Sequence, residues 1–349
     1  MKTISYKTTL ILYVVVSVLV ACQSMNNLTL SVTEPAAVFV PKHVHKIGIL
    51  NRSESTNNKT IDKIDQVFSI EGFNLDKEAA NRVISGLKDE FSKLGNFEKI
   101  VMVETDKVSN PGLGIFPSSI PWETVDTICQ RNDVDALIVL SFYDTDASVA
   151  YDTRTIEKVN AFGIKIPFIE HSATLTTNIK AGFRIYDNPS KAILDEAITN
   201  EWNTSIGRGI NPAKALEAIT GRKESVLQIS TQIGENYANR TQPFRIRVWR
   251  EYYVRGTKNF EIGKRKAQTG DWNGAAEHWH METNNSNSKI AGRACYNMGI
   301  INEINGDLDA ARKWVSKAYV EYKDRNALRY LNILKNRVAK NELLKYQKN

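Results

Sequence analysis

Three aspartates follow an apolar run near the middle of the chain. Residues 135–141 are almost continuously apolar, and Asp144, Asp146 and Asp152 come soon after them. Ligands of open α/β sheets bind where the strands end, and carboxylates at that point could hold a divalent cation. A metal-assisted hydrolase or a glycan-binding protein could use such a sheet edge. Aspartate is also frequent in turns, and we favour an acidic hairpin turn at these positions.

A second candidate is a short glycine-rich segment with one arginine. Gly207, Arg208 and Gly209 precede Asn211 and Pro212, a pair typical of a helix start. The backbone amides of such a start, together with Arg208, could hold a carboxylate or a phosphate. The alternative is an ordinary flexible cap. We therefore name these first three residues as a candidate anion-binding site.

Other chemical signatures do not reach a complete set. His43 and His45 alternate on one predicted strand, but two histidines without a third ligand do not make a metal site. Neither a Ser/His/Asp nor a Cys/His arrangement can be assigned from motifs, and the sequence has no Gly-x-Ser-x-Gly motif. We therefore predict a non-enzymatic protein with no metal and no cofactor.

The composition limits the class of protein. The chain has 349 residues, enough for two ordinary domains, with 42% hydrophobic and 24% charged residues. These values are close to globular averages and exclude a disordered, collagen-like or polytopic membrane chain. Three cysteines cannot form a disulfide framework. Cys129 and Cys295 lie in apolar helical contexts, so we expect two separately buried thiols rather than a bridge.

The N-terminus predicts export. A basic start precedes the apolar run Leu10–Val20, which is too short to span a membrane, and residues 1–21 have the pattern of a signal peptide. The sequence Leu19-Val20-Ala21-Cys22 resembles the lipobox of bacterial lipoproteins. That resemblance implies a diacylglycerol on Cys22, which would be the first mature residue.

The residues after Cys22 refine the predicted location. No aspartate follows the cysteine directly, and no acidic cluster of the kind that resembles a surface-export signal is present. We therefore expect an outer-membrane lipoprotein that faces the periplasm. Residues 22–42 are rich in Asn, Ser, Thr and Pro and are predicted to be a tether between lipid and domain.

Residues 43–250 are predicted to form an α/β module. Apolar periodicity indicates three strands separated by two helices, and this β-α-β-α-β order predicts a sheet with at least one covered face. A long alternating strand then follows over 173–185, with Phe183 on its buried side, which is typical of an antiparallel sheet. The predicted elements are strands at 43–50, 99–103, 135–141, 173–185, 192–202 and 244–248, and helices at 75–94, from Pro121 and at 213–239 with a break near Gly221.

This order of elements resembles α/β modules of envelope lipoproteins and of the Tol system. The run Lys46–Arg52, together with residues 135–142 and the lipobox, is similar to an uncharacterised family of Bacteroidota lipoproteins. The resemblance implies no catalytic residues. The expected fold class is therefore an α+β or α/β N-terminal module with a mixed sheet, followed by an all-α domain.

The last hundred residues repeat at an offset of 36. Gly263 aligns with Gly299, and the Gly-Asp pair at 270–271 aligns with the pair at 306–307. Small residues in the first helix and a Gly-Asp turn resemble the tetratricopeptide repeat. The resemblance implies that residues 251–349 form stacked helix pairs whose concave surface binds extended segments. The polar or small residues at the matched positions of the first helices are candidate partner-binding residues: Asn259, Lys266, Cys295 and Asn302.

The charge distribution suggests what the partner could be. The whole chain has a formal net charge of +7, and from Arg312 onward 11 basic residues stand against three acidic ones. A basic helical end favours an anionic surface, and the alternative is a solubilising helix face. We do not expect nucleic acid in the periplasm. The leading hypothesis is a non-enzymatic scaffold that binds an envelope protein or peptide.

Overall fold

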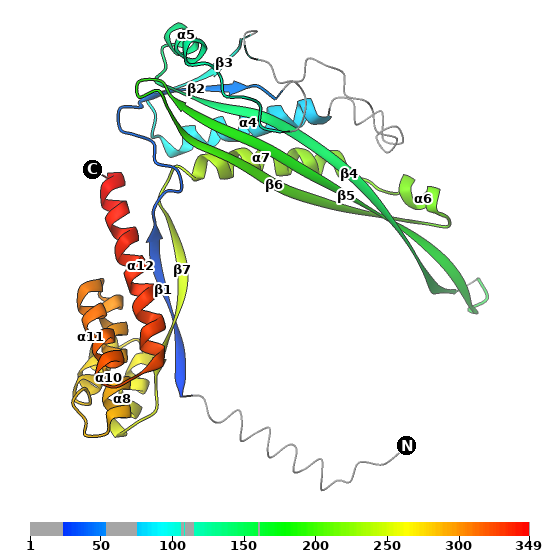
Figure 1. Ribbon diagram of the computed structural model, residues 1–349. Helices are drawn as coiled ribbons and strands as arrows, with labels where there is room; N and C mark the ends of the chain where they lie inside the picture. The colour runs from blue at the N-terminus through cyan, green and yellow to red at the C-terminus, as the bar shows by residue number, and fades with distance from the viewer. Residues whose placement is uncertain (1–23, 54–74, 106–107, 109–114, 160, 349) are drawn as a thin grey trace. The chain divides into compact units, whose positions relative to one another are not determined.

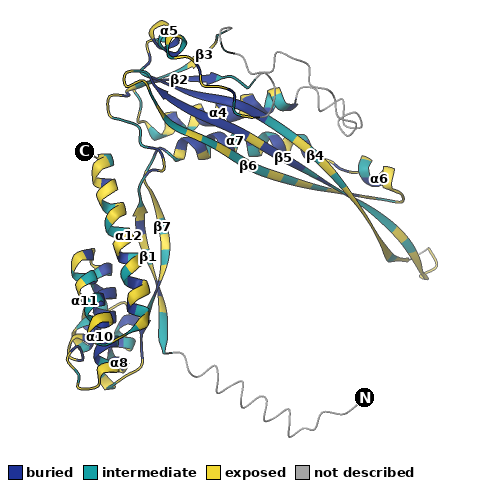
Figure 2. Cartoon of the chain, viewed as in Figure 1, coloured by how far each residue is buried: buried dark blue, intermediate teal, exposed yellow. Residues whose placement is uncertain are grey.

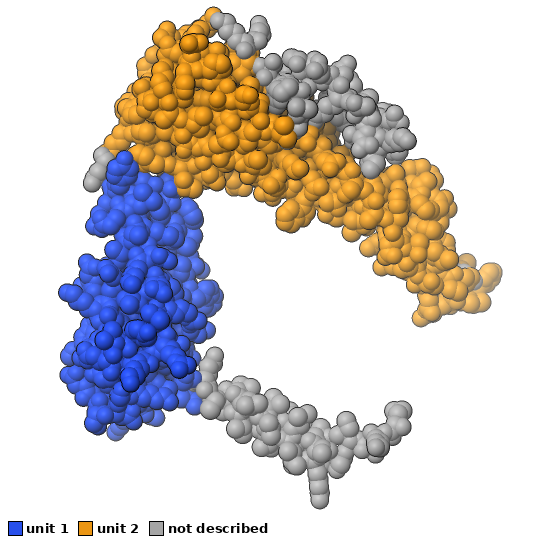
Figure 3. Space-filling model, viewed as in Figure 1, with its two compact units in different colours: residues 1–36, 243–349 blue, residues 37–242 orange. Residues whose placement is uncertain are grey.

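The structure is a computed structural model that describes residues 24–53, 75–105, 108, 115–159 and 161–348. The chain divides into two compact units (Figure 3). Residues 37–242 form one unit, called the sheet unit below. Residues 1–36 and 243–349 form the other, called the helical unit.

The sheet unit contains a five-stranded mixed sheet in the order β3-β2-β4-β5-β6. Strands β3, β2 and β4 run parallel, because helical crossovers lead from β2 to β3 and from β3 to β4. Strands β4, β5 and β6 then form an antiparallel meander. The mixed sheet therefore agrees with the expected fold class. The strands are β2 (Lys46–Asn51), β3 (Lys99–Val103), β4 (Ala136–Val159), β5 (Lys165–Asp187) and β6 (Ala192–Gly209).

Two helices cover one face of this sheet, as Figures 1 and 2 show. They are α4 (Leu75–Leu94) and α7 (Arg222–Asn239). The alternating side of β5 from 173 to 185 is buried, as predicted: residues 179–185 lie beneath these two helices, whereas Ala173 and Leu175 pack with Ala215 and Ile219. Phe183 stacks on Tyr237 with ring centroids 4.0 Å apart. The helices pack closely because both carry glycine at their contact. A Cβ on Gly86 would lie 2.3 Å from the Thr231 carbonyl oxygen, and one on Gly234 would lie 2.0 Å from that of Val83.

The opposite face of the sheet is covered at one end only. Helix α5 (Trp122–Asn132) packs Val125 and Cys129 against Leu137 and Val139 of β4. Beyond Phe142, which lies against Gly182, the face opposite α4 and α7 is exposed to solvent. We call this surface of β4, β5 and β6 the open face.

In the residues that the structure describes, the helical unit combines a two-stranded ribbon with five helices. Strand β1 (Met25–Glu34) pairs antiparallel with β7 (Phe244–Tyr253), so that Leu28 lies opposite Arg250 and Val32 opposite Ile246. The sequence predicts a tether at 22–42 and a strand at 244–248 within the α/β module. The structure instead pairs residues 25–34 of the first segment with the strand that begins at 244. The helices are α8 (Lys258–Gln268), α9 (Trp272–His280), α10 (Ser288–Ile304), α11 (Leu308–Val320) and α12 (Arg325–Lys348).

The 36-residue offset appears as two equivalent helical hairpins, α8–α9 and α10–α11. Gly270 and Gly306 both have positive φ, 85° and 83°, which glycine adopts without strain. The following aspartates, Asp271 and Asp307, each cap the next helix by accepting a 2.8 Å hydrogen bond from a backbone amide. An all-helical region therefore follows the sheet unit, as the sequence predicts. Among the residues that the structure describes, no helix is both long and apolar enough to cross a membrane.

Candidate functional site

Strand β7 is held on α10 by one buried amide side chain. The Nδ2 group of Asn297 donates a 2.7 Å hydrogen bond to the Tyr253 carbonyl oxygen, and its Oδ1 accepts a 2.7 Å bond from the Tyr253 backbone N–H. Asn297 is fully buried. Because both bonds go to main-chain atoms, this arrangement recognises an extended backbone whatever side chain it carries.

A buried ion pair holds the same strand a few residues earlier. Arg250 donates to both carboxylate oxygens of Glu303, over 2.8 and 2.9 Å, and the Tyr330 hydroxyl and Arg337 donate over 2.7 and 2.6 Å. Burial alone would raise the pKa of Glu303, but these donors outweigh it and hold the pKa below the ordinary value. Glu303 is therefore an ionised structural group whose oxygens are all engaged.

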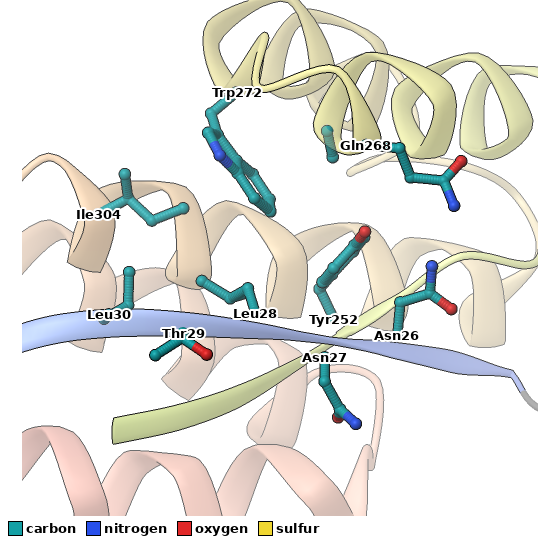
Figure 4. Close-up of a pocket in the computed structure, with 10 residues that line it drawn as sticks. Asn26, Asn27, Leu28, Thr29, Leu30, Tyr252, Gln268, Trp272 and Ile304 are labelled. Carbon is teal, nitrogen blue, oxygen red and sulfur yellow. The ribbon is translucent and has the colours of Figure 1, made fainter. Parts of the chain in front are cut away.

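A pocket of about 470 Å³ lies beside this ribbon, between β1 and the helices (Figure 4). The Tyr252 and Trp272 rings meet edge to face, with centroids 5.5 Å apart. Apolar side chains thus stand next to amide groups, so the pocket can hold an apolar side chain and bind polar atoms near it. The pocket is lined by Asn26, Asn27, Leu28, Thr29, Leu30, Tyr252, Ala267, Gln268, Trp272 and Ile304.

The predicted partner-binding residues lie close to this region but do not line the pocket. The Asn259 amide donates to Glu282 over 2.7 Å, and Lys266 forms a 2.8 Å ion pair with Asp271 at the turn before α9. Asn302 donates to the Met298 carbonyl oxygen of its own helix over 2.7 Å. All three are therefore partly engaged within the helical unit.

Cys295 cannot contact a partner, so its assignment to the binding surface is wrong. Its side chain is completely buried because it lies on the face of α10 that packs in the apolar core of the helical unit. Cys129, in the sheet unit, is also buried, and both thiols are free, as expected. Burial raises the pKa of Cys129 to about 12 and that of Cys295 to about 11, so both remain protonated.

Four residues of this region were not predicted as site residues from the sequence: Asn297, Glu303, Tyr252 and Trp272. One signal was available for Asn297, because Ala294, Asn297 and Ile301 have the spacing of a buried helix face. An amide at such a position has to find a buried hydrogen-bond partner.

The three aspartates lie within β4 rather than in a turn or at a strand end. The expected hairpin turn at these positions is therefore wrong, because β4 continues to Val159 and stays paired with β5 along this whole length. Asp144 and Asp146 lie two residues apart and thus share the open face, opposite Lys180 and Asn178 of β5. Across the described parts of the chain, no group of three His, Cys, Asp or Glu residues is arranged to hold a metal ion.

The glycine-rich segment forms the end of β6, and its glycines have a packing role. Helix α6 (Pro212–Glu217), capped by Asn211 as predicted, crosses this strand so closely that a Cβ on Gly207 would lie 2.0 Å from the Ala215 carbonyl oxygen. Arg208 extends toward Glu170, with its Nε 3.9 Å from the carboxylate. Anion binding here stays a prediction. Close packing against α6 is enough to explain why both positions are glycine.

Two further expectations concern the N-terminal cysteine and the basic C-terminal end of the chain. Cys22, the predicted lipidation site, lies outside the described residues. The basic end of the chain forms α12, where Arg329, Arg337 and Lys340 pair with Glu251, Glu303 and Glu34 of the same unit. Much of the local positive charge is therefore balanced within the helical unit.

Comparisons with solved structures find distant likenesses. The PelC dodecamer from Paraburkholderia phytofirmans is 8% identical, with a TM-score of 0.23, over 62% of this chain and 98% of that chain. A Helicobacter pylori protein named as a homologue of the neuraminyllactose-binding hemagglutinin is 12% identical, with a TM-score of 0.24, over 55% and 81%. At these TM-scores the likenesses carry no inference about fold or function. No curated protein matches the chain.

Family comparison divides the chain much as the structure does. Residues 44–253 match a domain of unknown function, DUF8603, and residues 261–336 match a second one, DUF6340. Neither description names an activity. Because the first match covers more than half of the 349 residues, the chain belongs to the family of the domain of unknown function DUF8603.

Proposed function

We propose that this protein is a non-enzymatic lipoprotein, of the kind found in Bacteroidota, which is anchored in the outer membrane through Cys22 and faces the periplasm. Its tetratricopeptide-like helical unit would serve as a scaffold for an envelope protein or peptide. The lipobox at residues 19–22 supports the anchor, and the helical hairpins with their pocket support the scaffold.

One observation carries the scaffold proposal: the helical unit binds an extended strand by its backbone. Asn297 holds both main-chain groups of Tyr253, so the first helix of the second hairpin has the chemistry needed to bind a peptide. The chain's own β7 occupies this position. A partner must therefore bind beside β7, where the pocket remains.

The pocket suits one anchoring side chain of a partner peptide. Leu28, Leu30 and Ile304 offer aliphatic contacts and Trp272 an aromatic one, while Gln268 at the rim offers an amide for the peptide backbone. We therefore propose that the partner binds the residues that line this pocket, rather than the matched polar positions of α8 and α10. Asn259, Lys266 and Asn302 retain at most a role at its periphery.

A pocket-filling substitution tests the scaffold. Gln268 is exposed, so Gln268→Trp should block the pocket without removing a core contact. Glu261→Trp, on an exposed position of the same helix that does not line the pocket, is the matched control. Affinity capture of the lipidated full chain from its own envelope should lose its partner with Gln268→Trp and keep it with Glu261→Trp. Equal capture by both variants would exclude this pocket as the binding site.

The anchor is tested separately. Cys22→Ala removes the sulfur that a thioether-linked lipid requires. Metabolic labelling with a radioactive fatty acid should label the unchanged protein and leave the variant unlabelled. Label retained in the variant would contradict the lipoprotein assignment.

A further inference from the structure

Strand β6 is a long edge of the sheet unit. It has 18 residues and lies at the end of the strand order, and among the described residues its backbone pairs only with β5 (Figure 1). An edge of this length carries a row of backbone groups ready to pair with another strand. Natural proteins usually interrupt such edges with proline, a bulge or a short strand. Strand β6 contains no proline, and the register shift in its pairing with β5 lies between Ile193 and Asp195, outside residues 196–208.

The side chains of β6 on the open face include three large apolar residues. Trp202 is 70% exposed, and Ile198 and Ile206, four residues to either side, are 55% and 57% exposed. They share one face because successive side chains alternate across a strand. Large apolar groups that remain exposed together at a sheet edge indicate an interaction surface.

The sequence on this face is complementary to itself about Trp202. If two copies of β6 run antiparallel with Trp202 opposite Trp202, each Ile198 lies opposite Ile206 of the other copy. The same register places Glu196 opposite Arg208, an acidic residue against a basic one. The open-face series that shows this symmetry is Glu196, Ile198, Asn200, Trp202, Thr204, Ile206 and Arg208.

The alternatives to this register lose that match. A shift of the centre by two residues, to Asn200 or Thr204, leaves neither Glu196 nor Arg208 opposite an ion of the other sign. A register centred between two residues would put the open face of one copy beside the covered face of the other. In the Trp202-centred register the covered side pairs Ala197 with Gly207, Thr199 with Ser205 and Glu201 with Asn203, so no like charges meet there.

We propose that β6 pairs antiparallel with β6 of a second copy of this chain, in the register centred on Trp202, so that two sheets join into one. The self-complementary pattern favours a second copy over an unrelated strand, because a two-fold interface requires the same patch to fit itself. Glu196 and Arg208 keep side chains that are 47% and 56% exposed beside their existing contacts with Arg184 and Glu170, and so remain accessible to the second copy.

Single cysteines test the register directly. In the full chain with Cys22→Ser, Trp202→Cys should form a covalent dimer on mild oxidation, because residues directly opposite have Cα atoms about 4.5–5.5 Å apart, within disulfide range. Asn200→Cys alone should not cross-link, since its counterpart lies about 13 Å along the strand. A mixture of Asn200→Cys and Thr204→Cys chains should cross-link. Cys129 and Cys295 do not interfere because both are buried.

Sedimentation of the chain without new cysteines tests association independently. The unchanged protein should sediment as a dimer, and Trp202→Lys should weaken the dimer at least about tenfold by placing like charges opposite each other. Trp249→Lys is the matched control, because Trp249 is 71% exposed on β7 of the helical unit. A monomeric unchanged protein, or a dimer that Trp202→Lys leaves intact, would overturn the proposal. Cross-linking by Asn200→Cys but not by Trp202→Cys would overturn the register.

Discussion

Strands β5 and β7 are held in their units by different combinations of contacts. In the sheet unit, β5 presents an unbroken series of alternating residues to α4 and α7, and the contact is almost wholly apolar. In the helical unit, β7 is fixed to α10 by a buried amide and a buried ion pair. Both strands thus bury apolar side chains, since Tyr252 and Tyr253 of β7 pack in the core of the helical unit, but β7 is held in addition by specific buried polar partners.

The difference shows how each arrangement responds to change. Apolar packing is non-directional, so it tolerates a similar side chain at some cost and fails gradually. A buried polar network requires every member, because an unpaired buried charge is strongly unfavourable. The contrast leads to four predictions, ordered from the largest expected effect.

Glu303→Ala should be the most damaging single change in the helical unit. It leaves Arg250, which is 8% exposed, without its carboxylate, and breaking a buried pair in this way costs about 3–5 kcal/mol of unfolding free energy. Urea unfolding measures the loss. The double variant Arg250→Met with Glu303→Met should recover only the part of the loss that comes from the unpaired Arg250, because Tyr330 and Arg337 still lose their acceptor. A double variant no more stable than Glu303→Ala would contradict the polar half of the comparison.

Phe183→Ala should have a comparable effect in the sheet unit. The side chain is fully buried and stacks on Tyr237, and truncating a buried Phe typically costs about 3–5 kcal/mol. Phe183→Leu should cost clearly less, because most of the volume remains. The urea midpoints of the two variants give the test, and an unchanged midpoint for Phe183→Ala would mean that β5 does not supply this core.

Acid should act on the helical unit through Glu303. Its folded-state pKa lies below the ordinary value of 4.5, so the ionised form stabilises the fold fully above about pH 4.5. That contribution is lost as the pH falls through the lowered folded-state pKa. Urea midpoints of the unchanged protein and of Glu303→Gln should therefore converge progressively as the pH falls below about 4.5, because the ionised form loses its advantage only there. Glu342→Gln, at an exposed position of α12, should show no convergence.

The smallest expected effects concern the two equivalent helix caps. Asp271→Ala and Asp307→Ala should each cost about 1 kcal/mol, because each removes one side-chain bond to a backbone amide at a helix start. Asp271→Ala also removes the exposed ion pair with Lys266, and Lys266→Ala measures that contribution separately. Thermal unfolding monitored by circular dichroism compares the two directly. A cap that matters in only one hairpin would show that the 36-residue equivalence of geometry does not extend to stability.

Local periodicity was enough to predict most elements of both units. The apolar spacing of 75–94 and the alternation of 173–185 each appear as predicted, in α4 and β5. The Gly-Asp turns also appear as predicted, because a positive φ and a side-chain cap depend on residues within one turn of the helix. The candidate site was harder to predict. The sequence pointed to α8 and α10, but it did not identify the residues that line the pocket.

The sequence by itself determined those features whose cause lies within a few residues: helix faces, strand alternation, capped turns and the 36-residue repeat. The pairing of β5 with the strand that follows it is also local, whereas only the tertiary structure decided that β1 pairs with β7. Segment 25–34 lies more than two hundred residues from its partner β7, and neither has an apolar pattern strong enough to indicate a neighbour. The tertiary structure also decided that Asn297, Arg250 and Glu303 are buried together, and that Asp144 and Asp146 lie within a strand. The physical reason is that local preferences act through the chain's own neighbouring residues, whereas burial and pairing depend on groups that only folding brings together.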